Sequence, residues 1–171
     1  MSRSLQLLFS TVVYVLFFAT FTYLPFFVAD LLVPKTINSG TDGNLFVAII
    51  VNLGLLGAFA VQHTIKARPA FKRWWTKWVP EAIERSTFVL AASVILILTF
   101  IFWQPMTKEI WKTENVLLQS ILWTTFFGGF ALALYSSFVI DHFELFGLRQ
   151  AWRAWRGEEA VQPEFKEKSL Y

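Results

Sequence analysis

Charged residues are missing from four long segments of this 171-residue chain. No Asp, Glu, Lys or Arg occurs in residues 4–29, 45–65, 86–107 or 116–140. A helix needs about 20 mostly apolar residues to cross roughly 30 Å of hydrocarbon, and a charge at the bilayer centre costs about 2.5–3.5 kcal/mol. We therefore predict four transmembrane helices, at about residues 5–29, 45–64, 86–104 and 116–140.

Long uncharged segments could also be buried helices of a soluble protein. Such helices carry a polar stripe, whereas residues 89–102 (VLAASVILILTFIF) show none. The chain is 56% hydrophobic and 16% charged, against about a quarter charged residues in soluble domains. The first apolar segment is longer than the roughly 7–15 residues of a signal-peptide core, so we expect an uncleaved anchor that bends or ends near Pro25. The fold class that follows is an all-α integral membrane bundle.

The distribution of basic residues predicts the orientation of this bundle. Twelve of the 15 Lys and Arg residues precede the first span, separate the second from the third, or follow the fourth. The opposite side carries three, at Lys35, Lys108 and Lys112. Because basic loops stay in the cytoplasm, both termini are predicted to be cytoplasmic. The net charge of +3 is too small to indicate a nucleic-acid partner, and the absence of cysteine excludes disulfides and thiolate sites.

Two amphipathic stretches lie on the same basic side. Between Pro69 and Pro80, aromatic residues recur at i, i+3, i+4 and i+7. These are Phe71, Trp74, Trp75 and Trp78. After the fourth span, an apolar stripe runs beside three arginines, Arg149, Arg153 and Arg156. That stripe comprises Leu145, Leu148, Trp152 and Trp155. Each pattern predicts an interfacial helix with its apolar face in the lipid and its cations toward the phosphates.

Polar and small residues inside the spans favour helix packing. Asn52 and Gln119 are expected to hydrogen-bond to neighbouring helices. Four glycines in the second and fourth spans are expected to allow close helix approach. They are Gly54, Gly57, Gly128 and Gly129.

The residues able to carry chemistry gather at the cytoplasmic ends of two spans. Gln62 and His63 end the second span, and Asp141, His142 and Glu144 follow the fourth. Asp141 and Glu144 share one helix face at i, i+3, with the histidine about 100° around. A metal site needs three or four converging ligands, and no spacing here is diagnostic, so we assign no metal. The residues either close their helices as ordinary interfacial groups or handle a substrate at the cytosolic mouth of the bundle.

Three segments resemble a known family. They are LLVPKTINSG (31–40), QHTIKARPAFKRWWTKWVPEAIERSTFVL (62–90) and IDHFELFGLRQAW (140–152). They are similar to bacterial methanethiol S-methyltransferases, membrane enzymes related to the isoprenylcysteine carboxyl methyltransferases. The resemblance implies a multi-pass protein of the bacterial inner membrane. It also implies that S-adenosylmethionine donates a methyl group to methanethiol, a small apolar thiol that partitions into the bilayer, giving dimethyl sulfide.

The resemblance implies roles for the polar residues at the span ends. A thiol must lose its proton to attack a sulfonium methyl group. The candidates for assisting this step are His63, His142 and Glu144. Candidate substrate-binding residues are those able to hold or pair with polar groups there, namely Gln62, Arg68, Arg85 and Asp141.

The C-terminal end departs from the family pattern. Residues 1–156 form the predicted membrane domain, and residues 157–171 are polar and without periodicity. Family members continue past a point like Tyr171 into an Arg-His-Pro motif and a segment that holds S-adenosylmethionine. We therefore expect the cofactor-binding residues beyond Tyr171 and the 171-residue chain alone to be inactive. The alternative is a non-catalytic four-helix membrane scaffold or partner subunit.

Overall fold

The computed structural model describes residues 1–66 and 68–158, and every regular element in these ranges is helical. Four of the helices are long and apolar enough to cross a membrane. They are α1 (Arg3–Ala29), α2 (Leu45–Lys66), α4 (Glu84–Phe102) and α5 (Val116–Ile140). The short elements are α3 (Pro69–Trp75), the 3-10 turn η1 (Glu81–Ile83), α6 (His142–Leu145) and α7 (Leu148–Arg156). The predicted all-α membrane bundle is confirmed.

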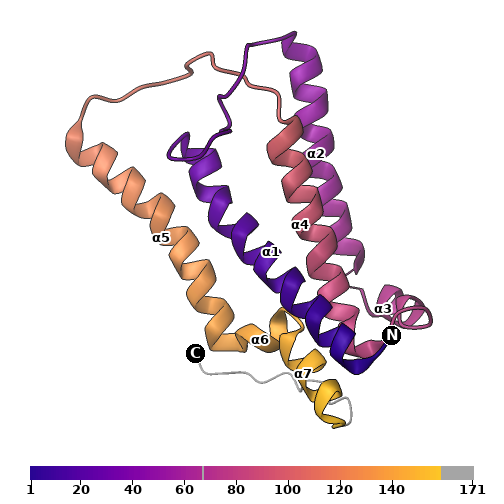
Figure 1. Ribbon diagram of the computed structural model, residues 1–171. Coiled ribbons are helices and arrows are strands. Elements are labelled where there is room, and N and C mark those ends of the chain that lie inside the picture. The colour runs from indigo at the N-terminus through magenta and orange to yellow at the C-terminus, as the bar shows by residue number, and fades with distance from the viewer. Residues whose placement is uncertain (67, 159–171) are drawn as a thin grey trace.

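Helix α4 lies between α1 and α2 and packs against both (Figure 1). Helix α5 inclines away from these three and joins them at one end through α6 and α7. Its contact with α1 along the span consists of aromatic pairs, with ring centroids 6.3 Å apart for Phe21 and Phe130 and 6.1 Å apart for Phe26 and Phe127. The N-terminus, α3, α6 and α7 therefore all lie at the same end of the molecule (Figure 1).

Small polar residues allow α1 and α4 to approach closely. Ser10 and Ser86 are fully buried, and the Ser86 hydroxyl bonds to the Ser10 hydroxyl at 2.8 Å. Val13 and Val89 are also buried, with 2% and 4% exposed. Because lipid is as apolar as these side chains, close packing and interhelical hydrogen bonds drive such contacts. The expectation that glycines play this part is wrong, since in the described part of the chain no atom from another element lies within 4 Å of a Cβ placed at any of the four span glycines.

Asn52 joins α2 to the segment that follows α4. Its amide nitrogen donates to the Gln104 carbonyl at 2.8 Å, and its amide oxygen accepts from the Gln104 N–H at 2.9 Å. The side chain is 3% exposed. Gln119, in contrast, donates to the Thr113 carbonyl just before its own helix, at 2.7 Å. The expected hydrogen bond to a neighbouring helix is thus wrong for Gln119, and Asn52 bonds instead to the backbone of the segment just after α4.

Helix α1 continues past Pro25 instead of ending there. The helix ends at Ala29 and is capped by Asp30, whose φ is 58°. The Asp30 carboxylate accepts hydrogen bonds from Thr36 and Asn38, and these bonds lower the pKa of Asp30. A proline inside a membrane helix is tolerated where neighbouring groups satisfy the freed backbone.

Both interfacial stretches are more broken than their patterns predict. Helix α3 ends at Trp75, so Trp78 lies outside it and is 77% exposed. The Trp75 ring still stacks on Phe71 at 5.9 Å, and its indole also donates to the Thr87 hydroxyl of α4 at 2.8 Å. The second stretch is divided by Gly147, whose φ of 85° ends α6 and lets α7 start in a new direction. The prediction of one interfacial helix carrying Leu145, Leu148, Trp152 and Trp155 is therefore wrong, because two helices share these residues.

Candidate functional site

Asp141 turns the chain out of α5 and back across the bundle. Helix α5 ends at Ile140, and the Asp141 carboxylate caps α6 by accepting from the Glu144 N–H at 3.2 Å. This reversal places His142 beneath α1, with only 2% of the residue exposed. Its ring stacks on Phe138 with a centroid distance of 4.0 Å.

Hydrogen bonds to both ring nitrogens fix the tautomer of His142. The Ser137 hydroxyl lies 2.7 Å from Nδ1 and donates its own proton to the Leu134 carbonyl at 2.6 Å. With that proton committed, the Ser137 oxygen accepts from Nδ1–H, and Nε2 carries the lone pair. The Tyr14 hydroxyl, 2.8 Å from Nε2, is then the donor to it. A neutral His142 is thus bonded at both nitrogens.

Burial lowers the pKa of His142 below its usual value, which predicts a pH-dependent stability. The unfolded chain takes up a proton near pH 6.5, whereas the folded chain does so only at lower pH. Stability from this group is therefore present above about pH 6.5 and is lost as pH falls toward the folded pKa, at up to about 1.4 kcal/mol per pH unit. Thermal unfolding in detergent at pH 7.5 and 5.5 should show this loss. The same pH slope in a His142→Gln variant would contradict it.

Glu144 ties three elements together beside the histidine. The residue is 6% exposed, and Arg153 Nη1 of α7 lies 3.5 Å from its Oε2. Arg85 Nη1 of α4 donates to the Glu144 backbone carbonyl at 3.3 Å. Among the described residues, its Oε1 has no hydrogen-bond partner. Asp141 pairs instead with Arg149 of α7, in a partly exposed ion pair.

The structure therefore divides the candidate residues into two groups. Asp141, His142, Glu144 and Arg85 meet at the junction of α1, α4, α6 and α7. The other three, Gln62, His63 and Arg68, lie on and just after α2. There the His63 ring is exposed and packs against Phe59 and Phe88, at 5.8 and 5.3 Å. Gln62 donates to the Phe88 carbonyl at 3.4 Å, and Arg68 is exposed.

No group of three or more His, Cys, Asp or Glu residues within residues 1–66 and 68–158 is placed to hold a metal ion.

The sequence analysis missed two residues that hydrogen-bond to His142. Tyr14 is 128 positions away, and its one signal is a phenol within an apolar span. Ser137 precedes the histidine by five residues on a different helix, so no helical spacing links the two.

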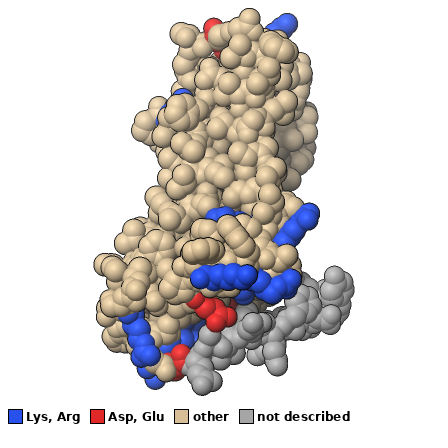
Figure 2. Space-filling view, turned by 90° about the vertical axis from the view of Figure 1, so that its right-hand side faces the viewer, with Lys and Arg blue, Asp and Glu red and all other residues tan. Residues whose placement is uncertain are grey.

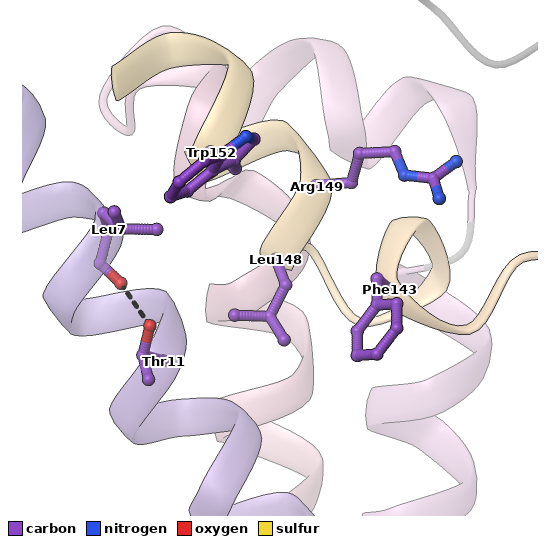
Figure 3. A pocket seen from close by; sticks show the side chains of 6 residues that line it. All are labelled: Leu7, Thr11, Phe143, Leu148, Arg149 and Trp152. Atoms are coloured by element: carbon purple, nitrogen blue, oxygen red, sulfur yellow. Dashed lines mark hydrogen bonds between the residues drawn. The ribbon is translucent and has the colours of Figure 1, made fainter. Parts of the chain in front are cut away.

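A groove opens beside this junction, between α1 and the α6–α7 pair (Figure 3). Its volume is about 420 Å³. Its lining residues are Leu7, Thr11, Phe143, Leu148, Arg149 and Trp152. The Thr11 hydroxyl donates to the Leu7 carbonyl at 2.9 Å and so is already engaged (Figure 3). The walls are therefore largely apolar, with one arginine among them.

Basic side chains surround this end of the molecule. On the face shown in Figure 2, most Lys and Arg side chains gather toward the end where α3, α6 and α7 lie. Four apolar helices of spanning length, with a buried polar junction at their basic end, define a multi-pass helical membrane protein.

Sequence comparison identifies the family within this class. Over 171 residues the chain is 44% identical to methanethiol S-methyltransferase of Mycobacterium tuberculosis, covering 70% of that protein. It is 46% identical over 169 residues to methanethiol S-methyltransferase 1 of Bradyrhizobium diazoefficiens, covering 59% of it. Identity to the methanethiol S-methyltransferase of Crocosphaera subtropica is 38%, covering 67% of that protein. The chain belongs to the methanethiol S-methyltransferase family.

These alignments include 99–100% of the chain, which spans 59–70% of the length of those relatives. No family model and no solved structure matches the chain. The resemblance noted in the three sequence segments is thereby confirmed. A methyltransferase requires a methyl donor, so the family also implies one.

Proposed function

We propose that the protein methylates methanethiol to dimethyl sulfide in the bacterial inner membrane, using S-adenosylmethionine as the donor. The observation that carries the proposal is the 38–46% identity, across at least 99% of this chain, to methanethiol S-methyltransferases of three bacteria. The positive-inside rule supports a cytoplasmic location for the basic end and both termini. A site at this end is accessible to a small thiol from the lipid and to a charged donor from the cytosol.

Proton removal is the step that the described residues can perform. A thiol becomes an effective nucleophile when its S–H proton is withdrawn. The Tyr14 hydroxyl donates to Nε2 of His142, so its oxygen still has lone pairs to accept a further hydrogen bond. A thiol proton passed to Tyr14 oxygen releases the tyrosine proton to Nε2, leaving a thiolate and a protonated His142. Burial among Phe138 and neighbouring rings excludes water from this exchange.

The other members of the junction are proposed to position this pair. Arg85 holds α6 by its bond to the Glu144 carbonyl, and Asp141 caps the same short helix. Glu144 is the alternative proton acceptor, because its Oε1 is buried and lacks a partner among the described residues. Within the described residues, Gln62, His63 and Arg68 form no hydrogen bond or ion pair with this cluster, which favours His142 over His63 as the proton acceptor.

S-adenosylmethionine supplies the methyl group from its sulfonium centre. The groove between α1 and α7 does not fit this donor, because its walls are largely apolar and its lining residues include no carboxylate to pair with the sulfonium and ammonium groups. We therefore derive no step through the donor. Its binding residues are proposed to lie outside residues 1–158.

Labelled product formation tests the proposal. The protein, expressed with any codons that follow Tyr171 in frame, should convert methanethiol and methyl-labelled S-adenosylmethionine into labelled dimethyl sulfide. Because the donor does not cross lipid, inside-out vesicles should be active and right-side-out vesicles inactive. The chain ending at Tyr171 should give no product above the empty-vector level. Absence of product from well-inserted full-frame protein would reject the enzyme and support the scaffold alternative.

A further inference from the structure

The groove between α1 and α7 is much larger than methanethiol. Methanethiol has two heavy atoms, whereas the groove volume of about 420 Å³ is in the range of sites for ligands of drug size. An occupant that fills it must be long or bulky, and it must be apolar over most of its surface. Leu7 lines it from α1, and Leu148 and Phe143 line it from the α6–α7 side (Figure 3).

The charges around the groove favour an anionic headgroup. Arg149 lies at the rim with its side chain 43% exposed, and its guanidinium points away from α1 (Figure 3). One of its nitrogens is engaged by Asp141, but a guanidinium has five N–H donors, so others can reach a phosphate. Arg3 lies beside Gly157 at the far end of α7, with its Nη1 3.0 Å from the position of a Cβ there. One arginine side chain, Arg149 or Arg3, therefore lies near each end of α7.

The position of the groove indicates which kind of molecule can occupy it. It lies at the basic end of a membrane-spanning bundle, between the first turns of α1 and an amphipathic helix that carries Trp152 and arginines. Tryptophan and arginine at this depth mark the headgroup layer. The molecule present there that combines a long apolar chain with a phosphate is a phospholipid.

We propose that the groove binds one anionic phospholipid, with an acyl chain between Leu7 and Leu148 and its phosphate on Arg149. This lipid joins α1 to the α6–α7 pair. Phe143, which lines the groove, packs edge-on against the His142 ring at 5.3 Å, so the lipid also supports the wall of the polar junction. The proposal goes beyond the proposed methyl transfer and does not depend on it.

Native mass spectrometry of the purified 171-residue chain tests this binding. The chain is offered equal amounts of phosphatidylglycerol and phosphatidylcholine with the same acyl chains. We expect one phosphatidylglycerol to be retained preferentially. Thr11→Phe should fill the groove from α1 and displace two or more methylenes, lowering retention at least about tenfold. Thr11 is exposed and its hydroxyl is internally bonded, so the helix tolerates the change.

Matched variants distinguish lipid bound in the groove from lipid bound nonspecifically around the helices. Thr22 is also exposed and lies three turns further along the same face of α1, outside the groove, so Thr22→Phe should leave retention unchanged. Arg149→Gln should lower the preference for phosphatidylglycerol about fivefold, whereas Arg73→Gln, an exposed arginine on α3, should not.

Three results would overturn the proposal. One is equal retention of the two lipids by the unaltered chain. Another is equal loss in Thr11→Phe and Thr22→Phe, which would indicate an unspecific lipid shell. The third is displacement of the lipid by glycerol phosphate alone, which would show that the acyl chain contributes nothing to binding.

Discussion

Replacing Gly147 by alanine should destabilise the protein by about 2–5 kcal/mol, combining left-handed backbone strain with overpacking. The φ of Gly147 is 85°, a conformation that L-residues adopt at a cost of about 1–2 kcal/mol. A Cβ there would also lie 2.7 Å from the Ser86 Oγ and 2.9 Å from the Ser86 backbone nitrogen. Ser86 cannot yield easily, because its own hydroxyl is bonded to Ser10 in the packed interface of α1 and α4. Thermal unfolding in detergent measures the loss.

Gly157 provides the control for this prediction. Its φ of 81° is nearly the same, but among the residues that the structure describes its Cβ would meet only the flexible guanidinium of Arg3, at 3.0 Å. Gly157→Ala should therefore show the backbone cost alone, about 1–2 kcal/mol. Equal losses in the two variants would show that the close approach of Gly147 to α4 does not matter for stability.

The four spans could be predicted because their signal is local. Uncharged segments of more than 20 residues have few alternatives to a membrane helix, so the fold class followed from the sequence alone. The break at Gly147 could not be predicted in the same way. Within an amphipathic pattern a single glycine is compatible with a continuous helix. Its left-handed conformation becomes meaningful only when Ser86, 61 positions earlier, lies against it.

The aromatic loop between α2 and α4 shows the same limit. Helical spacing placed Trp74, Trp75 and Trp78 on one lipid-facing side. In the structure the Trp75 indole finds a hydroxyl on α4, and α3 stops there. A half-buried indole N–H favours a hydrogen-bond partner, and local periodicity does not encode such a tertiary contact.

The candidate site was predictable in part. Asp141, His142 and Glu144 are close in sequence, and all three lie at the start of α6. In sequence His63 and His142 looked equivalent, since each ends a span. What separates them is the chain reversal at Asp141, which folds His142 under α1, whereas His63 stays on the exposed side of α2. The Tyr14 contact depends on that reversal and leaves no trace in local spacing.

The second large effect is expected on kcat when His142, but not His63, is replaced by glutamine. General-base assistance contributes about 100- to 10,000-fold to a rate, so His142→Gln should lower kcat for dimethyl sulfide formation at least about 100-fold. Glutamine keeps a donor and an acceptor for Ser137 and Tyr14, which limits structural damage. His63→Gln should leave kcat within about twofold, because no described contact links His63 to the junction.

The central claim is that the polar junction at the basic end of the bundle serves the reaction through His142. The direct test is kcat for labelled dimethyl sulfide in the two glutamine variants, measured on full-frame protein with matched insertion and matched thermal stability. The account predicts a large loss for His142→Gln and near-normal turnover for His63→Gln. Undiminished turnover in a folded His142→Gln protein, or an equal loss in both variants, would contradict it.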